Sequence, residues 1–540
     1  MTPGPAARYS TEVDVLIVGA GPAGAVAAHT LADRGLSVMC LEQGDWVAPS
    51  EIPGGQPEFE LLTRTAWNWE PNTRRRWQDY PLDLADADVS APMFAGVGGT
   101  SVLYGAHWHR LLPSDFRVRS LDGVGTDWPI QYEDLHPFYD RVDEFIGVAG
   151  LGGDPAYPDQ DFPMPPHPLG AAGMKMAAAM NHLGWHWWPG THAIPSAAFK
   201  AMGSCVRWGV CEHGCPAGAK ASFDIGYWPH ATALGVELIT HARVAQITVE
   251  RTGLADGAIW LDVEGREHRV KANAVVVAAN GVGTPRLLLL SNDRYPDGLA
   301  NSSGLVGKNL MLHPNCATIG VYSDDVQSWN GPAGQLLYSL QFYETDRSRG
   351  FVRGSKWSLM PVPGVLRALD LFNDRPFELR WGAAAHDLAN HAGHVLSWSA
   401  CIEDLPEETN SVTLDETLTD TSGLPAPKLT YRISENSRQS LAFAMDRMRE
   451  VHRAAGAWHV VDEPNIASGH LLGTARMGTD PKTSVVDEFC RAHDIPNLLV
   501  VDGSVMVTSG AVNPTSTITA LALRASEHLA DTARDQRCLL

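Results

Sequence analysis

The histidine at position 470 combines a side chain and a setting that suit proton transfer. It lies in the glycine-rich segment Gly469-His-Leu-Leu-Gly473. An imidazole whose pKa is near its ordinary value of ~6.5 can take a proton close to neutral pH. A histidine beside a glycine turn is also a common hydrogen-bonded structural residue. The segment alone therefore leaves a general base and a structural histidine both open.

A second polar residue, Asn513, stands where a helix is expected to begin. It directly precedes Pro514, and asparagine followed by proline is typical of an N-cap and a first helical position. The spacing of the leucines that follow, between 521 and 529, predicts that this helix is long. Capping alone is enough to explain an asparagine at this position.

Three cysteines, Cys205, Cys211 and Cys215, bring three thiols into one short segment, with His213 among them. Thiolates are the soft ligands that zinc and iron–sulfur clusters require. The same spacing also fits a loop that holds no metal. We treat the three cysteines as possible iron–sulfur ligands and take the metal-free loop as the default expectation.

Glycines near the N-terminus predict a dinucleotide site. A β-branched run predicts a strand, the segment Gly19-Ala-Gly21-Pro-Ala-Gly24 a tight turn, and the alanine-rich stretch after it a helix. In this order the glycines let the backbone approach a pyrophosphate at the helix N-terminus. A second apolar run, 36–41, ends in Glu42, which is placed to accept hydrogen bonds from a ribose hydroxyl.

Further segments predict the rest of this sheet and its loops. Gly99, Thr100 and Ser101 belong to another glycine-rich turn, which suits close approach of the backbone to a planar ring or a phosphate. The apolar run 274–279 reads as a buried parallel strand, and the segment 280–285 as a turn after it. A last strand over 497–501 is expected to end at Asp502.

Composition limits the class of protein. The chain has 540 residues, of which 44% are hydrophobic, so we expect a globular protein with two large domains or several smaller ones. Lys and Arg number 41 against 62 Asp and Glu, a net charge of −21 that disfavours nucleic acid as a partner. No apolar run reaches the ~18 residues that a membrane span needs. We expect no membrane span, no export and a cytoplasmic location.

Taken together, these segments resemble the glucose-methanol-choline (GMC) family of FAD oxidoreductases, in order and over nearly the whole chain. The resemblance rests on the N-terminal glycines with Glu42, Gly98-Gly-Thr-Ser101, Gly283-Thr-Pro285, His470-x-x-Gly-Thr-x-x-Met-Gly, Val501-Asp-Gly-Ser504 and Asn513-Pro-Thr-x-Thr. The stretch 113–135 is most similar to the branch that holds pyranose oxidases, glycoside 3-oxidases, sugar dehydrogenases and aminoglycoside 6'-oxidases.

The resemblance implies an α/β FAD-binding Rossmann-like domain joined to an α+β substrate-binding domain. The FAD-binding domain is expected to be discontinuous and to comprise 1–125, 230–315 and 465–540. The substrate-binding domain is expected to comprise 126–229 and 316–464, with the cysteine-containing loop 205–215 inside it.

The resemblance also implies roles for single residues. His470 takes the proton of the substrate hydroxyl while hydride passes to flavin N5, and Asn513 holds the same oxygen. Leu103 stands near the position where relatives with covalent FAD carry a histidine, so we expect non-covalent FAD. The cofactor is expected to meet Gly19, Gly21, Gly24, Glu42, Gly99, Thr100, Ser101, Val244, Asp502, Asn513 and Thr515.

The expected reaction is oxidation of a hydroxyl of a sugar, glycoside or cyclitol to a carbonyl, with oxygen or another electron acceptor reoxidising FAD. One alternative is an aminoglycoside or amino-sugar 6'-oxidase, which the negative net charge favours. Another is the FAD subunit of a sugar dehydrogenase complex that passes electrons through an iron–sulfur cluster. The tryptophans at 108, 185, 187 and 188 could stack on sugar rings, although tryptophan is more often a core residue.

Overall fold

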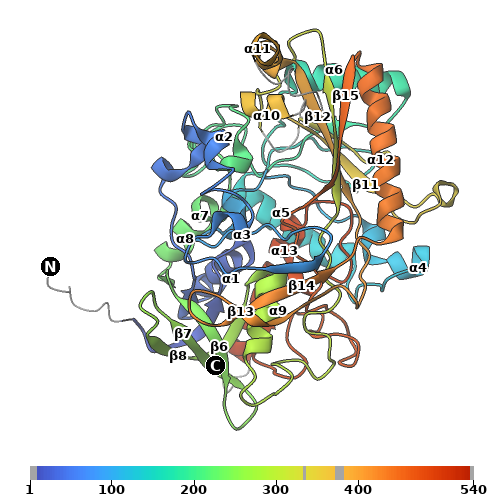
Figure 1. Cartoon of the computed structure of the whole chain (residues 1–540). Helices are drawn as coiled ribbons and strands as arrows, with labels where there is room; N and C mark the ends of the chain where they lie inside the picture. The colour runs from blue at the N-terminus through green and yellow to red at the C-terminus, as the bar shows by residue number, and fades with distance from the viewer. Residues whose placement is uncertain (1–8, 333–335, 371–381, 536–540) are drawn as a thin grey trace, which may run out of the picture.

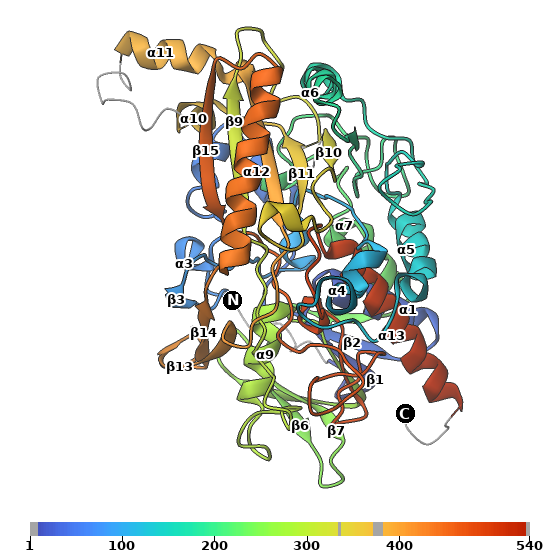
Figure 2. The ribbon, with the colours of Figure 1, turned by 90° about the vertical axis from the view of Figure 1, so that its right-hand side faces the viewer.

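A computed structural model describes residues 9–332, 336–370 and 382–535 of the chain. The outer ends of two expected ranges, 1–8 and 536–540, lie outside the described residues. The described strands form three sheets. Figure 1 shows the seven-stranded sheet at one end of the molecule and the six-stranded sheet at the other, and Figure 2 shows the same arrangement from the side.

The seven-stranded sheet contains the strands that the β-branched runs predict. Strand β1 (Glu12–Val18) pairs in parallel with β2 (Val38–Leu41) and with β8 (Glu267–Val277). Strand β5 (Glu237–Ile239) extends the sheet beyond β2, and β16 (Leu498–Val500) pairs in parallel with β8. The strands predicted near 13–18, 36–41, 274–279 and 497–501 are therefore confirmed, and they form a mainly buried parallel sheet.

Two antiparallel strands and two helices complete this half of the molecule. Strand β7 (Ala255–Leu261) pairs with β8 and with β6 (Arg243–Val249). Helix α1 (Pro22–Asp33) follows the glycine turn and packs against α13 (Thr515–Asp535). The long C-terminal helix predicted after Asn513 is therefore confirmed.

Helix α9 (Asn280–Leu290) corrects one prediction. The segment 280–285, which the sequence predicts as a turn, is the start of this helix, and Asn280 caps it by accepting from the N–H groups of Val282 and Gly283. A proline at 285 cannot donate to the carbonyl of Gly281 four residues earlier. The hydroxyl of Thr474 donates to that carbonyl at 2.7 Å instead. This tertiary hydrogen bond satisfies the carbonyl, so the helix can contain the proline.

The six-stranded sheet is antiparallel, and helix α12 (Glu435–Ala454) packs against one face of it together with α6 (Gly170–Leu183). The other face carries alternate residues of three strands toward a cavity. In spatial order the strands are β15 (His459–Ile466), β9 (Asn315–Val321), β12 (Val395–Ile402), β11 (Ser355–Met360), β10 (Leu337–Ser339) and β4 (Trp188–Pro189).

A small third sheet joins distant parts of the chain. It consists of β13 (Ser411–Thr419), β14 (Pro425–Tyr431) and β3 (Asp83–Ala87). The carboxylate of Asp420, in the turn between β13 and β14, is buried and forms ion pairs with Arg286 of α9 at 2.7 Å and Arg243 of β6 at 3.0 Å. These ion pairs attach the small sheet to the seven-stranded sheet and its helices.

The remaining helices are placed at the surface and between the sheets. Helix α5 (Tyr132–Ile146) packs on α13 and buries Leu135, Tyr139, Val142 and Ile146, whose spacing places them on one face of a helix. None of the helices in the described part of the chain combines the length and the apolar surface that a membrane crossing requires. The shorter helices are α2 (Phe59–Leu62), α3 (Pro71–Arg74), α4 (Val118–Asp122), α7 (Phe223–Gly226), α8 (Trp228–Ala233), α10 (Val365–Asp370) and α11 (Gly382–Asn390).

Candidate active site

A cavity of about 690 Å³ runs from the glycine turn before α1 to the inner face of the six-stranded sheet. It brings together residues that are hundreds of positions apart in the sequence. Of the expected site residues, these line it: Gly19, Gly21, Glu42, Gly99, Thr100, Ser101, Val244, His470, Asp502, Asn513 and Thr515. Gly24 does not line it and has a different function in the fold.

The glycines at the start of α1 differ in what surrounds them. A Cβ added to Gly21 would meet no atom within 4 Å, so this position opens toward the cavity at the N-terminus of α1. A Cβ on Gly24 would lie 2.0 Å from the carbonyl oxygen of Gly19, so that glycine allows the helix to pack closely on its own loop. The second glycine turn lies against the first: a Cβ added to Gly99 would be 3.0 Å from the Cα of Gly21. The cradle that a pyrophosphate needs is therefore present.

Glu42 lies at the end of β2 and is buried. Its two carboxylate oxygens accept hydrogen bonds from the backbone N–H groups of Ala20, at 2.9 Å, and Gly44, at 2.8 Å. Burial raises the pKa of Glu42, and these N–H groups oppose that rise. The carboxylate thus fixes the glycine turn, and Glu42 still lines the cavity, as does Val244, the second residue of β6.

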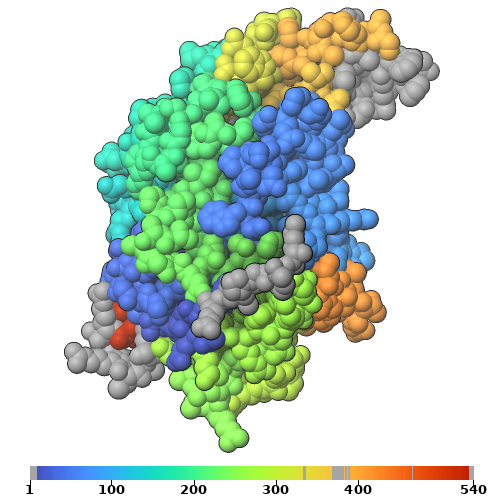
Figure 3. All heavy atoms as spheres, turned by 90° about the vertical axis from the view of Figure 1, so that its left-hand side faces the viewer, coloured from blue at the N-terminus to red at the C-terminus, as the bar shows by residue number. Residues whose placement is uncertain are grey.

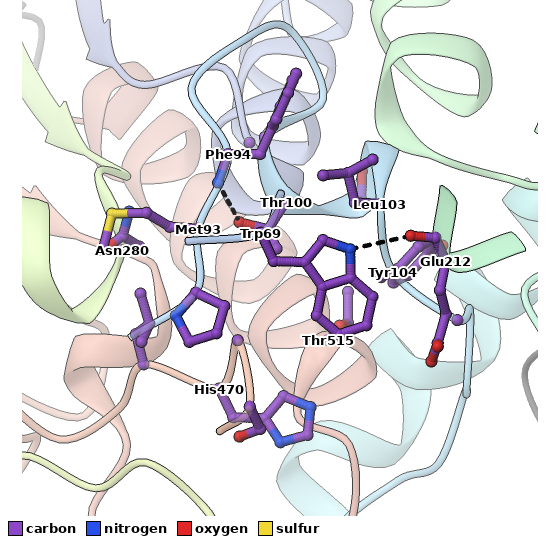
Figure 4. Close-up of a pocket in the computed structure, with 18 of the residues that line it drawn as sticks. Trp69, Met93, Phe94, Thr100, Leu103, Tyr104, Glu212, Asn280, His470 and Thr515 are labelled. Atoms are coloured by element: carbon purple, nitrogen blue, oxygen red, sulfur yellow. Dashed lines mark hydrogen bonds between the residues drawn. The ribbon is translucent and has the colours of Figure 1, made fainter. Parts of the chain in front are cut away.

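Thr100, Ser101 and Asp502 make hydrogen bonds that shape the middle of the cavity. Thr100 accepts from the backbone N–H of Phe94 at 3.2 Å, as Figure 4 shows, and the Ser101 hydroxyl donates to the carbonyl of Gly98 at 2.6 Å. Asp502 accepts from the N–H of Asn280 at 3.0 Å and so joins the end of β16 to the start of α9. Burial raises the pKa of Asp502.

His470 is placed opposite His313 by a short antiparallel contact. The backbones of Met311 and Leu472 exchange two hydrogen bonds, of 3.0 and 3.1 Å, which sets 313 against 470. The Nδ1 atoms of the two imidazoles are 2.9 Å apart. A glycine at 473 allows the chain to turn here, because it has φ +86° and its added Cβ would lie 2.3 Å from the carbonyl oxygen of Asn309.

This contact determines which nitrogen of His470 can act as a base. Nε2 of His313 lies 2.6 Å from the carbonyl oxygen of Gly510, which can only accept, so His313 donates from Nε2. Burial lowers the pKa of His313 to about 4, so its Nδ1 is an acceptor near neutral pH. His470 must then donate from Nδ1, which leaves the lone pair on Nε2.

Asn513 and Lys356 complete the polar end of the cavity. The carboxamide nitrogen of Asn513 lies 3.3 Å from Nε2 of His470, and its oxygen accepts from Nζ of Lys356 at 2.5 Å. Helix α13 begins at Thr515, and both polar ends of the Asn513 carboxamide meet Lys356 and His470 rather than a backbone N–H of the helix, so capping does not explain this asparagine. Nζ of Lys356 also lies 3.2 Å from Nδ1 of His107.

Burial shifts the pKa of every titratable group at this end. It lowers the pKa of His470 well below the ordinary value, with His313 and Lys356 adding to the effect. The pKa of His107 falls in the same way, and that of Lys356 falls to about 7. His470 is therefore neutral near pH 7 and can take a proton.

Sequence comparison identifies the family of this site. Residues 13–315 and 406–522 match two family models that are both described as GMC oxidoreductase. The chain belongs to the GMC oxidoreductase family. It is an FAD-dependent enzyme that acts on CH–OH groups.

Several GMC relatives have named substrates. The chain is 41% identical to a 2-methyl-1,2-propanediol dehydrogenase of Mycolicibacterium austroafricanum, over 96% of this chain and 95% of the relative. It is 31% identical to the large subunit of a fructose dehydrogenase of Gluconobacter japonicus, over 95% and 97% of the two chains. It is also 31% identical to a paromamine 6'-oxidase of Streptomyces fradiae, over 96% and 91%.

Solved GMC structures share the fold. A formate oxidase of Aspergillus oryzae superposes with a TM-score of 0.65 at 16% identity, over 99% of this chain and 100% of the other. A pyridoxine 4-oxidase gives the same TM-score at 18% identity, over 95% and 98%. The expected two-part α/β and α+β architecture is confirmed.

The residues of this GMC chain fit an FAD molecule. The open position at Gly21 leaves room for a pyrophosphate beside the N-terminus of α1, and the cavity continues from there to His470. The N-terminus of α13 also reaches the cavity through Thr515, where its dipole favours negative charge. Leu103, near the position where covalent relatives carry a histidine, lines the same cavity.

The cysteine loop of this GMC chain is held by a lysine. Nζ of Lys220 donates to the carbonyl oxygens of Val102 at 2.8 Å, Tyr104 at 3.0 Å and Cys211 at 2.8 Å. The loop is thereby tied to the turn that lines the cofactor cavity. Figure 3 shows its outer face, where the green loop lies beside the blue segment around Gly54, whose added Cβ would be 2.7 Å from the carbonyl of Gly214.

The three loop cysteines do not form a metal-binding group in the described part of the chain. The group found there consists of His313, Cys401 and His470. Its histidines are already joined by a hydrogen bond, and burial raises the pKa of the Cys401 thiol to about 12, which disfavours the thiolate that a metal needs. The comparisons do not indicate an iron–sulfur cluster.

Sequence patterns missed Lys356, His313 and His107. Lys356 lies in the strand segment Ser355–Met360, where only its alternation with Ser358 hints at a polar face. His313 depends on the tertiary contact between Met311 and Leu472, which has no local signature. Trp185, Trp187 and Trp188, which could stack on a sugar ring, do not line the cavity, and Trp108 is buried in the core.

Proposed function

We propose that this enzyme oxidises a hydroxyl of a sugar, glycoside or related small polyol to a carbonyl. The observation that carries the proposal is the hydrogen-bond chain that leaves the Nε2 lone pair of His470 beside the carboxamide of Asn513. His470 takes the hydroxyl proton at Nε2, and Asn513 holds the oxygen from which it comes. FAD, when bound, accepts the hydride from the carbinol carbon.

The cavity wall formed by the six-stranded sheet, beside His470 and Asn513, supports a substrate with several hydroxyl groups. Alternate residues of β9, β11 and β12 face the cavity in three cross-strand rows. The row nearest Asn513 holds Lys356, Cys401 and Asn315, and the next holds Ser358, Ser399 and Ala317; the third holds Met360, Ser397 and Ile319. Hydroxyl, amide and amine groups on this wall can bind the additional oxygens of a polyol.

The cofactor roles are proposed from the same geometry. Gly21 would lie against the pyrophosphate, Glu42 would accept from the ribose, and the backbone at Val244 would contact the adenine. Gly99, Thr100 and Ser101 would line the flavin side, and Thr515 with the α13 N-terminus would face the flavin pyrimidine. Asp502 uses its carboxylate within the protein and would shape the ribityl region.

The ranges of the two domains are part of this proposal. The strands of the seven-stranded sheet fall within 1–125, 230–315 and 465–540. Of the six-stranded sheet, β10, β11 and β12 fall within 316–464, β9 and β15 lie mainly within it, and β4 lies within 126–229. We therefore propose the first set as the FAD-binding domain. The segments 126–229 and 316–464 would form the substrate-binding domain.

An amino-sugar substrate is the second candidate. Glu212 lines the cavity beside Trp69, whose indole donates to the backbone carbonyl of Glu212 at 3.1 Å (Figure 4). A carboxylate there would bind an ammonium group of an aminoglycoside, and the likeness to a paromamine 6'-oxidase agrees. Burial raises the pKa of Glu212 to about 7, so this attraction would strengthen as the pH rises.

Anaerobic reduction of the flavin tests both candidates. We expect D-fructose or 2-methyl-1,2-propanediol to bleach the visible spectrum of the purified holoenzyme, and readmitted air to show whether oxygen is the acceptor. Bleaching by paromamine alone would favour the amino-sugar candidate. A flavin spectrum that none of a panel of sugars, glycosides, diols and amino-sugars changes would contradict the proposed substrate class.

A further inference from the structure

Lys356 is a buried lysine whose hydrogen-bond partners are both neutral. Its side chain is on β11, faces the cavity and is almost fully buried. The carboxamide oxygen of Asn513 and Nδ1 of His107 accept from its Nζ. An ammonium has three N–H donors, so one remains beyond these two contacts.

Lys220, a buried lysine that does not line the cavity, shows how this protein accommodates a structural lysine. Its three donors meet three backbone carbonyls, those of Val102, Tyr104 and Cys211. Lys356 has no such set, and the group that raises its pKa is the Cys401 thiol rather than a carboxylate. Burying a cation without a counter-charge is unfavourable, so a negatively charged oxygen would be bound strongly at this position.

We propose that Lys356 is a further catalytic residue, which binds the oxygen of the reacting hydroxyl together with Asn513 and stabilises the negative charge on it. The proposal rests on the proposed function. In the reaction, the O–H bond breaks, its electron pair stays on oxygen, and the proton moves to Nε2 of His470. The negative charge on the oxygen disappears when the hydride leaves the carbon and the C=O bond forms. Lys356 therefore stabilises the state in which this oxygen is charged more than it stabilises the neutral substrate or product.

The groups that surround Lys356 keep a constant charge near neutral pH, so a change in the charge of Lys356 can be distinguished from a change in theirs. The imidazoles of His107, His313 and His470 have pKa values lowered by burial, to about 4 for His313 and well below the ordinary value for the other two. Burial raises the pKa of Cys401, on the neighbouring strand, to about 12. Of Lys356, these imidazoles and Cys401, Lys356 is therefore the group whose charge changes between about pH 6 and about pH 8, since its pKa is about 7. Glu212, elsewhere in the cavity, also has a pKa of about 7, so a variant that keeps Glu212 and holds a permanent charge at 356, Lys356→Arg, assigns the pH dependence to Lys356.

Acetate binding tests the anion site without a substrate. We expect acetate to perturb the visible flavin spectrum of the holoenzyme and to bind about tenfold more tightly near pH 6 than near pH 8, because the charged fraction of a group with a pKa near 7 falls by about that factor. Lys356→Met should abolish this binding, and Lys356→Arg should retain it at both pH values. Lys175→Met, which removes an equal charge from an exposed ion pair with Asp324, is the control.

The rate of flavin reduction tests the catalytic role. With 2-methyl-1,2-propanediol or D-fructose, Lys356→Met should lower the rate constant by about 100-fold at saturating substrate, as loss of a group that binds a developing oxyanion does. Lys356→Gln keeps an uncharged donor and should lie between Met and the wild type. Because Lys356 and Asn513 act on one oxygen, the loss in Lys356→Met with Asn513→Ala should be smaller than the product of the single losses.

The two measurements separate the two proposals. A wild-type holoenzyme that does not bind acetate, or a Lys356→Met variant that binds it equally well, would overturn the anion site. A variant that binds no acetate but reduces its flavin at the wild-type rate would overturn the catalytic role. If no tested substrate reduces the wild-type flavin, the proposed function is wrong, whereas the acetate titration still decides whether Lys356 binds an anionic oxygen.

Discussion

His313 sets the protonation pattern of His470: their Nδ1 atoms lie 2.9 Å apart, and His313 is itself oriented by the carbonyl of Gly510. The carbonyl requires a donor at Nε2 of His313, so Nδ1 of His313 accepts from His470. Nε2 of His470 is left with its lone pair beside Asn513. A chain of three groups, none of which is charged, thus prepares the base.

Replacing His470 tests the base directly. His470→Ala should retain FAD, because the side chain is not part of the pyrophosphate cradle, and should lose the general base. We expect the rate of anaerobic flavin reduction to fall by about 10²–10⁴-fold or more, as for other general bases. Rapid-mixing absorbance gives the rate, and the flavin-to-protein ratio gives the cofactor content. Reduction at the wild-type rate would remove His470 from the mechanism.

Replacing His313 tests whether it orients the base. His313→Leu removes the acceptor for the Nδ1–H of His470, and the loss of such a supporting hydrogen bond lowers activity by about 10- to 100-fold. His313→Gln offers a carboxamide oxygen as a substitute acceptor and should recover part of the rate. Steady-state kinetics should show the loss in kcat more than in KM. Equal losses in the Leu and Gln variants would show that an acceptor is not what His470 needs.

The pH dependence of reduction follows from the buried imidazoles. Burial lowers the pKa of His470 well below its ordinary value, so its unprotonated, active form persists as the pH falls through the ordinary range. The rate constant for flavin reduction should therefore not fall on the acid side until the pH is well below ~6.5. Reduction measured between about pH 5 and about pH 8 checks this. An acid limb centred near ~6.5 would show that His470 is solvated in the working enzyme.

The glycines of the first turn allow a matched test of cofactor binding. Gly21 has φ −73°, which any residue adopts, and its added Cβ meets no protein atom. Gly21→Val should therefore fold but fill the space for the pyrophosphate, and we expect purified protein with little flavin and a normal far-ultraviolet circular dichroism spectrum. In Gly24→Val the side chain would collide with the Gly19 carbonyl, so this variant should lose thermal stability itself. Full flavin content in Gly21→Val would contradict the proposal that the pyrophosphate of FAD lies against Gly21.

The parts of this structure that the sequence predicts are those with local signatures. The strands around 13–18 and 274–279 are continuous apolar runs, and α13 begins after an Asn-Pro pair. The predicted turn at 280–285 is a helix because Asn280 supplies its cap, while Thr474, far away in the sequence, bonds the carbonyl that Pro285 leaves unpaired. Lys356 and His313 have no local signature, because their importance comes from pairing with Asn513 and His470 across the fold.

The attachment of FAD gives the last prediction. A covalent bond to the flavin requires a nucleophilic side chain at the ring, and Leu103 stands near the position where covalent relatives carry a histidine. Tyr104, next to it, donates its hydroxyl to the carbonyl of Ala221 at 2.8 Å, and burial raises its pKa, so it is not a phenolate nucleophile. Acid precipitation should therefore release all of the flavin into the supernatant. Yellow protein in the pellet would show a covalent link, and mass spectrometry of its peptides would identify the residue.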